Sequence, residues 1–193
     1  MILSDGAAAV APSFRTLNLS SLAFAGPFSF LETVSMSAHI IHADAPLGAL
    51  IRYTDHAPKP PARFTKKLAA WERRNGVGRL VKKEPARERP TYSSPASITL
   101  HEGNFASSGV ILVTVMRTHS VDSDLSFEVI ERPAIGMVRV LQDFGGNSEL
   151  LHLAESREAA ELWLAKNRHS AARLEDVTAD EVGADIVEGR AAA

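Results

Sequence analysis

Lysine and arginine are concentrated in one short stretch of this chain, RFTKKLAAWERRNGVGRLVKK at residues 63–83. Ammonium and guanidinium groups pair with phosphate oxygens, and each phosphate that they neutralise releases counterions. The stretch therefore predicts a small binding protein that contacts the backbone of nucleic acid. The residues predicted to make this contact are Arg63, Lys66, Lys67, Arg73, Arg74, Arg79, Lys82 and Lys83.

Other interpretations of this charge stay open. Residues 56–92 carry eleven Lys/Arg against three acidic residues, a net charge of +8, within a chain of net charge −2. Residues 149–193 carry five Lys/Arg against ten acidic residues, a net charge of −5, and could pair with the basic segment inside the fold. An acidic protein surface is another possible partner, and plain solvation of a helix face is the simplest explanation. No zinc-finger spacing or helix-turn-helix pair is present, so any nucleic-acid contact is expected to tolerate all sequences.

Histidine and carboxylate side chains are the other groups that could carry chemistry. His39 and His42 stand three residues apart with Asp44 close by; on a helix they would share one side, but the sequence specifies no third metal ligand. The nucleophile elbow, the phosphate loop and the dinucleotide fingerprint are all missing. Cysteine is absent, which excludes disulfides and thiolate sites. We predict no catalytic residue, no metal and no cofactor.

Two further hypotheses stand beside nucleic-acid binding. The chain could be a protein-interaction module, an inhibitor or assembly factor, that binds through a sheet edge or through Trp71 and Trp163 if these are exposed. It could also be a small enzyme, because active sites are assembled in space and need no linear motif. The enzyme hypothesis requires a pocket that gathers histidine and carboxylate groups.

The basic segment needs an element to position it. Pro61 suits a first helical turn and Gly76 the residue after a last one, so a helix is predicted between them. Phe64, Leu68 and Trp71 follow a helical spacing and are predicted to dock on a sheet. On the same wheel the cations of residues 63–74 share one face. The proline-punctuated stretch 82–95 is predicted to be a loop, in which Arg87 and Arg89 extend the basic field if the loop folds back.

The second half of the chain predicts an antiparallel sheet. Residues 109–117, GVILVTVMR, form the run richest in β-branched residues and are predicted to be its central strand. Gly145-Gly146-Asn147 predicts a hairpin turn. The other predicted elements are strands at 47–53, 77–81, 97–102, 125–131, 137–143, 149–154 and 172–177, and helices at 155–168 and about 179–188. These elements predict an α+β fold, with about 5–7 antiparallel strands and two or three helices packed mainly on one face.

Composition sets the domain organisation. The chain has 193 residues, of which 45% are hydrophobic and 23% charged, as in an ordinary globular domain. We expect a poorly ordered N-terminal extension at 1–35, a single α+β domain at 36–190 with its basic helix–loop segment at 56–92, and a short tail at 191–193. No apolar run approaches the ~20 residues that span a bilayer, so no membrane partner is expected. The absence of cysteine fits a cytoplasmic location.

Overall fold

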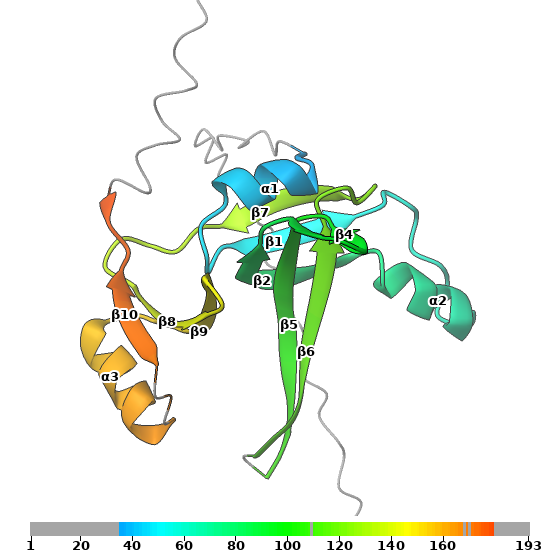
Figure 1. Cartoon of the computed structure of the whole chain (residues 1–193). Coiled ribbons are helices and arrows are strands. Elements are labelled where there is room, and N and C mark those ends of the chain that lie inside the picture. The colour runs from blue at the N-terminus through cyan, green and yellow to red at the C-terminus, as the bar shows by residue number, and fades with distance from the viewer. Residues whose placement is uncertain (1–34, 109, 168, 170, 180–193) are drawn as a thin grey trace, which may run out of the picture. The chain divides into compact units, whose positions relative to one another are not determined.

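The computed structural model of the chain describes residues 35–108, 110–167, 169 and 171–179. Within them the predicted α+β class is confirmed: an eight-stranded antiparallel sheet, a separate two-stranded hairpin and three helices are present (Figure 1). The sheet has more strands than the 5–7 predicted. The helix predicted at 179–188, the tail at 191–193 and nearly all of the extension predicted at 1–35 lie outside the described residues.

The helices are α1 (Ala38–Asp44), α2 (Thr65–Glu72) and α3 (Arg157–Lys166). The strands of the main sheet are β1 (Leu50–Thr54), β2 (Gly76–Glu84), β5 (Ser97–Ser107), β6 (Val110–Ser120), β7 (Ser126–Glu131), β8 (Val138–Phe144), β9 (Asn147–Ala154) and β10 (Ala172–Asp176). The separate hairpin consists of β3 (Arg87–Arg89) and β4 (Tyr92–Ser94). No helix in this part of the chain is long and apolar enough to cross a membrane.

Strand β2 connects the different parts of the sheet. It pairs with β5 along one side, where Arg79 lies opposite His101 and Lys82 opposite Thr99. On its other side it pairs first with β1 and then, at Lys82, with β9. Strand β9 continues through β8 to β10, and β1 continues to β7. A single nine-residue strand therefore has three partners.

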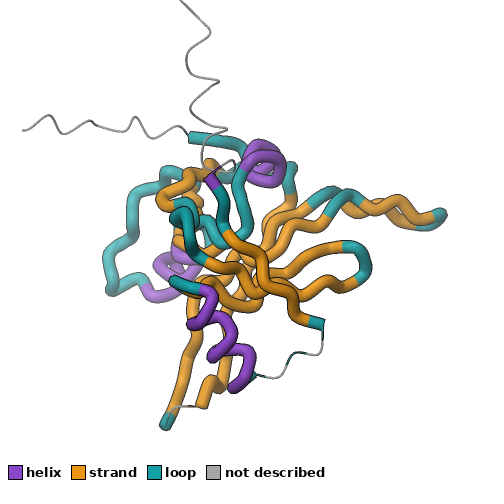
Figure 2. Tube along the Cα trace, turned by 90° about the vertical axis from the view of Figure 1, so that its left-hand side faces the viewer, coloured by secondary structure: helices purple, strands orange, loops and turns teal. Residues whose placement is uncertain are grey.

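Two groups of buried side chains form the main cores. The larger lies between α1 and strands β1, β2, β5 and β7, and includes Ile41, Tyr53, Leu100 and Phe127. The smaller lies where α3 covers β8 and β9, and Ala160 is its buried helical residue. Figure 2 shows the helices at separate places against the strands. Each core therefore has its own helix, α1 for the first and α3 for the second.

The predicted glycine turn is confirmed, and the structure adds a helix cap that was not predicted. Gly145 and Gly146 have φ values of 59° and 84° and turn the chain from β8 into β9, a conformation that glycine adopts without strain. Ser156 caps α3, because its hydroxyl oxygen accepts a hydrogen bond of 3.2 Å from the backbone N–H of Ala159.

The prediction that residues 109–117 form the central strand is wrong. Strand β6 pairs only with β5, and β5 pairs with β2 only as far as His101. The outer parts of β5 and β6, residues 103–108 and 110–116, extend as a two-stranded ribbon beyond the rest of the sheet (Figures 1 and 2). We call the segment 103–116 the arm. β-Branched composition favours a strand but does not decide whether that strand is buried.

Two predictions for the basic segment are also wrong. Helix α2 contains no buried residue and Phe64 is exposed, so the stripe of Phe64, Leu68 and Trp71 does not dock on the sheet. Residues 82–95 are not an irregular loop, because β2 continues to Glu84 and the β3–β4 hairpin follows.

Candidate functional site

The eight predicted phosphate-binding cations do not form one surface. Only Lys66 and Lys67 lie within α2, while Arg63 precedes the helix and Arg73 caps its C-terminal end. The remaining predicted cations, apart from Arg74, lie on β2. The prediction of a single basic helix carrying five cations on one face is therefore wrong.

Half of these cations are paired or partly buried inside the fold. Arg74 bridges two carboxylates, with Nε 3.0 Å from Asp55 and Nη2 2.7 Å from Asp124. The hydrogen bond and charge of Arg74 help to hold the pKa of Asp124 below its usual range. On β2, Arg79 donates to the carbonyl of Gly48, Lys82 pairs with Glu84 at 2.8 Å, and Lys83 is half-buried. Burial lowers the pKa of Lys83.

The internal pairing with residues 149–193 is not seen for the paired cations of the basic segment, which use other carboxylates. The carboxylates that pair with Arg74 and Lys82 come from the residue after β1, the β6–β7 turn and β2 itself, not from residues 149–193. Three of the described acidic residues in 149–193 pair with other arginines: Asp176 and Glu161 with Arg157, and Glu175 with Arg139 and Arg173.

The other four cations remain exposed. Arg63 and Lys67 both lie over the ring of Phe64, at 4.9 and 5.4 Å from its centre. Lys66 and Arg73 are exposed, and none of the four side chains forms an ion pair within the described part of the chain. These four residues are therefore the ones available to an external anion.

A polar cluster joins the end of α2 to the sheet. Glu102 is the extra residue of a β-bulge in β5, a feature that redirects a side chain out of the regular alternation. Its carboxylate accepts hydrogen bonds from Arg117 Nε at 2.6 Å and Nη2 at 3.1 Å, and another from the hydroxyl of Tyr53. Arg117 Nη1 also donates to the carbonyl of Arg73 at 3.1 Å. Because Arg117 uses three donors, its guanidinium is fixed in position.

Ionisation within this cluster is set by burial and by these hydrogen bonds. Burial opposes ionisation of Glu102, but the hydrogen bonds from Arg117 and Tyr53 outweigh it and lower the pKa of Glu102. Burial and the hydrogen bond to Glu102 raise the pKa of Tyr53 above its ordinary value. The cluster therefore holds a carboxylate, a guanidinium and a neutral phenol at neutral pH.

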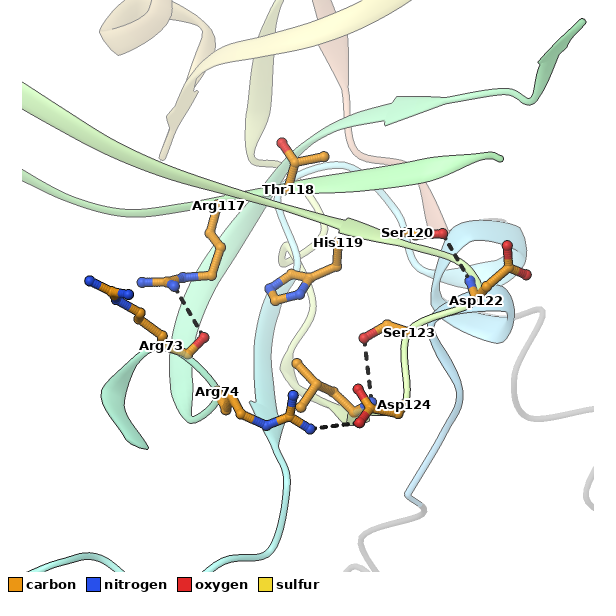
Figure 3. A pocket seen from close by; sticks show the side chains of 10 residues that line it. Arg73, Arg74, Arg117, Thr118, His119, Ser120, Asp122, Ser123 and Asp124 are labelled. Carbon is orange, nitrogen blue, oxygen red and sulfur yellow. Dashed lines mark hydrogen bonds and ion pairs between the residues drawn. The ribbon is translucent and has the colours of Figure 1, made fainter. Parts of the chain in front are cut away.

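An open pocket of about 410 Å³ lies beside the cluster (Figure 3). Arginines reach it from two directions, Arg73 and Arg74 from the end of α2 and Arg117 from β6. Its other lining residues are Thr118, His119, Ser120, Asp122, Ser123, Asp124 and Leu125. We call this space the α2 pocket.

His119 forms the inner wall of the α2 pocket. Only 8% of the residue is exposed, and its ring lies 4.7 Å from Tyr53 and 5.3 Å from Phe127, between ring centres. Its buried Nε2 has no hydrogen-bond partner among the described residues. Burial, together with the charge of Arg117, lowers the pKa of His119, so the imidazole is neutral at pH 7.

This environment makes stability depend on pH. The unfolded chain protonates His119 near pH 6.5, whereas the folded chain resists protonation until a lower pH. Between the two pKa values the unfolded state binds more protons than the folded state, so the free energy of unfolding increases with pH. The protein therefore becomes less stable as the pH falls below about 6.5. Urea unfolding at pH 7.5 and 5.5 measures the loss. His119→Phe, which keeps an aromatic ring in place, is expected to lose less stability between the two pH values than the unchanged chain; equal losses would contradict this prediction.

A second pocket, of about 550 Å³, lies under the β3–β4 hairpin. Arg87, Arg89 and Tyr92 reach it from the hairpin, and Tyr92 is 60% exposed. Thr118 and Ser120 of β6 line both this pocket and the α2 pocket. The two pockets therefore lie on either side of the base of β6: Arg117 and His119 face the α2 pocket, whereas Thr118 points away from it (Figure 3). We call the two pockets together the groove.

Some of the residues that line the groove were indicated by the sequence. The basic field was expected to include Arg87 and Arg89 if their loop folded back, and the hairpin folds so that both line the groove. Arg117, His119 and Tyr92 were missed as a group because they come from distant parts of the chain. One local signal could have indicated the position of Tyr92: Pro90 favours a turn in a short polar hairpin, and Tyr92 follows it by two residues.

The other candidate residues form no catalytic or metal site among the described residues. His39 and His42 lie on α1, but His42 Nε2 is 3.2 Å from the carbonyl of Glu84, and no group of three metal-ligating side chains is present in this part of the chain. The α2 pocket does bring His119 near Asp122 and Asp124, as the enzyme hypothesis requires. Within the described chain the buried Nε2 of His119 bonds to neither carboxylate.

The two tryptophans are partly buried and each has a partner. The indole N–H of Trp71 donates to the carbonyl of Ala57 at 2.7 Å, and Lys59 lies 5.5 Å from the ring centre. Trp163 is stacked between His152 and His169, with ring centres 4.9 and 5.6 Å away. Neither tryptophan is a free anchor for a partner.

The fold and the site together define an α+β protein with an open, arginine-lined groove at the base of a long β-ribbon. The chain belongs to the family described as uncharacterised conserved protein UCP036055, whose model matches residues 36–181. The match includes the groove and the arm. Searches of curated proteins and of solved structures gave no match to the chain.

Proposed function

We propose that this protein binds the sugar–phosphate backbone of single-stranded nucleic acid along the groove. The observation that carries the proposal is that arginines line pockets on both sides of the base of β6, and that Thr118 and Ser120 line both pockets. Arginines stand at both ends of this path, so successive phosphates of one strand would meet cations as the strand crosses β6. The exposed cations of the α2 segment, Arg63, Lys66, Lys67 and Arg73, extend the path beyond the α2 pocket.

The charge along the groove supports an anionic ligand despite the nearby carboxylates. Asp124 is paired with Arg74, and Glu84 is paired with Lys82. Asp122 is the remaining acidic residue of the lining. Arg73 and Arg89 therefore outnumber the carboxylates that are not already paired. Arg117 is itself paired with Glu102, so its charge is not in surplus, but its remaining N–H donors are held in a direction that Glu102 and the carbonyl of Arg73 fix, which lowers the entropy cost of binding.

Single strands fit the groove better than duplexes. Proteins that bind single strands without sequence preference combine a cationic groove with exposed aromatic rings on which bases stack. Tyr92 supplies such a ring at the edge of the groove. Helix α2 has eight residues, about 12 Å of length at 1.5 Å per residue, and lies outside the groove's floor, so it is not a helix inserted to read bases.

Fluorescence anisotropy tests the proposal. Labelled single-stranded DNA, single-stranded RNA and duplex DNA are titrated over a salt series with the unchanged chain and with a variant in which Arg63, Lys66, Lys67 and Arg73 are all alanine. We expect binding of the single strands to weaken with salt. The plot of log affinity against log salt has a negative slope, and in the variant this slope should become shallower by about 0.7 for each phosphate that is no longer neutralised. The control variant replaces Arg52, Arg157, Lys166 and Arg173, which removes the same charge away from the groove.

Tyr92→Ala is the second variant of the same experiment. Loss of one stacked base is expected to weaken single-strand binding by about 1–3 kcal/mol while changing the salt slope little. Equal weakening by the groove and control variants would reduce the effect to net charge. Failure of all three nucleic acids to bind at low salt would overturn the proposal. Binding of polyglutamate in their place would identify an acidic protein as the partner.

A further inference from the structure

The arm has a surface that is unusual for a part of a protein exposed to water. Five large apolar side chains on it are between 51% and 66% exposed: Phe105, Ile111, Leu112, Val113 and Met116. At about 150–250 Å² for one large side chain, they expose on the order of 500 Å² together. A patch of this size is as large as the largest on a typical monomer and marks an interaction surface.

The arm also has no packing partner within the described residues. A two-stranded ribbon alone is marginally stable in water, and it is normally supported by a third strand or by a helix. The three helices pack elsewhere or stay exposed, and β6 pairs only with β5. Neighbouring residues on β6, Leu112 and Val113, are both exposed, so neither face of the ribbon is the polar face of a half-buried strand. The arm therefore has the composition of a buried ribbon.

Charge indicates what kind of partner covers it. The fourteen residues from Gly103 to Met116 include no charged side chain. Exposed strands of monomeric proteins usually carry lysine or proline, which oppose edge-to-edge association, and the arm has neither. A surface without charge has no pattern for selecting an oppositely charged partner, and it meets no like-charge repulsion from a copy of itself. The absence of basic residues also separates the arm from the proposed nucleic-acid groove.

We infer that the arm is a dimerisation element and that it packs against the arm of a second copy of this chain. Because these side chains lie on both faces of the ribbon, one face of each arm packed against the other would bury about half of them, on the order of 500 Å² of apolar side chain between the two copies. The backbone and small side chains add to this, and the total corresponds to a weak dimer, below the roughly 1,200–2,000 Å² of a stable, specific interface. Identical ribbons match in length and chemistry, and a two-fold arrangement closes at two copies.

The first test is the oligomeric state of the full chain. Light scattering after size exclusion, over a concentration series, is expected to give a dimer, and Leu112→Asp should weaken dimerisation by at least about tenfold because each copy would bury a charge. Leu162→Asp is the matched control: Leu162 lies on α3 and is 64% exposed, close to the 66% of Leu112. A monomer at every concentration would overturn the inference, as would equal effects of the two variants.

Cross-linking provides a test that does not depend on destabilising the arm. The chain has no cysteine, so each introduced thiol is the only one present. With a short bismaleimide, Thr114→Cys on the arm is expected to give covalent dimers, whereas Ser93→Cys on the β3–β4 hairpin is not. Cross-linking at position 93 alone would place the contact elsewhere and overturn the inference. If Leu112→Asp leaves a monomer that still binds single strands, the dimer and the groove are independent functions.

Discussion

Glu102→Ala is expected to lower the free energy of unfolding by about 2–4 kcal/mol. The change leaves the guanidinium of Arg117 and the hydroxyl of Tyr53 without their shared acceptor. Removing one member of a fully buried ion pair typically costs about 3–5 kcal/mol, because the other charge stays buried and unpaired. The side chains of Glu102 and Arg117 are 18% and 28% exposed, so water can compensate in part, and the expected loss is correspondingly smaller.

Urea unfolding followed by circular dichroism measures this loss, and two variants bracket it. Glu128→Ala removes the partner of Arg52, whose side chain is 52% exposed, and should cost less than about 1 kcal/mol because exposed pairs contribute little. Glu102→Gln retains an acceptor without the charge and should lie between the two. A loss at Glu102→Ala no larger than at Glu128→Ala would mean that the cluster is not a structural unit.

Phe127→Ala is expected to destabilise the fold by about 3–5 kcal/mol. Phe127 is 1% exposed, its ring contacts those of Tyr53 and His119, and its backbone forms both hydrogen bonds of the bridge to Met36. The substitution opens a cavity between α1 and the sheet, and rigid neighbouring strands can close it only in part. The cavity also removes the aromatic wall behind His119.

Phe144→Ala is the matched comparison for the core substitution. Phe144 ends β8 and is 79% exposed, so its loss should change the free energy of unfolding by about 0.5 kcal/mol or less. Thermal and urea unfolding of both variants give the comparison. Similar small losses at the two positions would show that the core around Phe127 is loosely packed.

Local signals predicted most of the elements correctly. Alternation identified β7, where Leu125 and Phe127 are buried as the pattern requires, and the paired glycines identified the β8–β9 turn. Acidic residues at the start of the predicted helix, Glu155 and Glu158, and basic residues at its end, Lys166 and Arg168, indicated α3. These features depend on residues close together in sequence, so the sequence carries the whole signal.

Errors arose where long-range packing decides the outcome. The run Val110–Met116 has the composition of a central strand, but β2 is already paired along both sides and only β5 is left to it. The α2 stripe has a helical spacing, yet no strand is placed to receive it. Neither fact can be known before the pairing of β2 is known.

The sequence predicted which cations the basic segment contains, but not which of them the fold leaves available to a ligand. Lys66, Lys67, Arg63 and Arg73 are exposed as expected, whereas Arg74 and Lys82 are ion-paired and the cations of β2 are partly buried. The difference depends on Asp55, Asp124 and Gly48, which no spacing rule connects with the basic segment. Whether these cations bind nucleic acid stays a prediction, as does a cytoplasmic location.

The three partners of β2 also bear on how the chain folds. The β5–β6 and β8–β9 hairpins close short loops and can form early, but Lys82 must meet Glu149, 67 residues further along the chain. Loops of that length close slowly, because the entropy cost is met before many contacts repay it. We expect the half of the sheet made by β8, β9 and β10 to acquire its final position only after β1 and β5 have formed the surface around β2. The last folding step would then join two preformed cores across β2, where Val81, Leu141 and Leu150 form a small cluster between them.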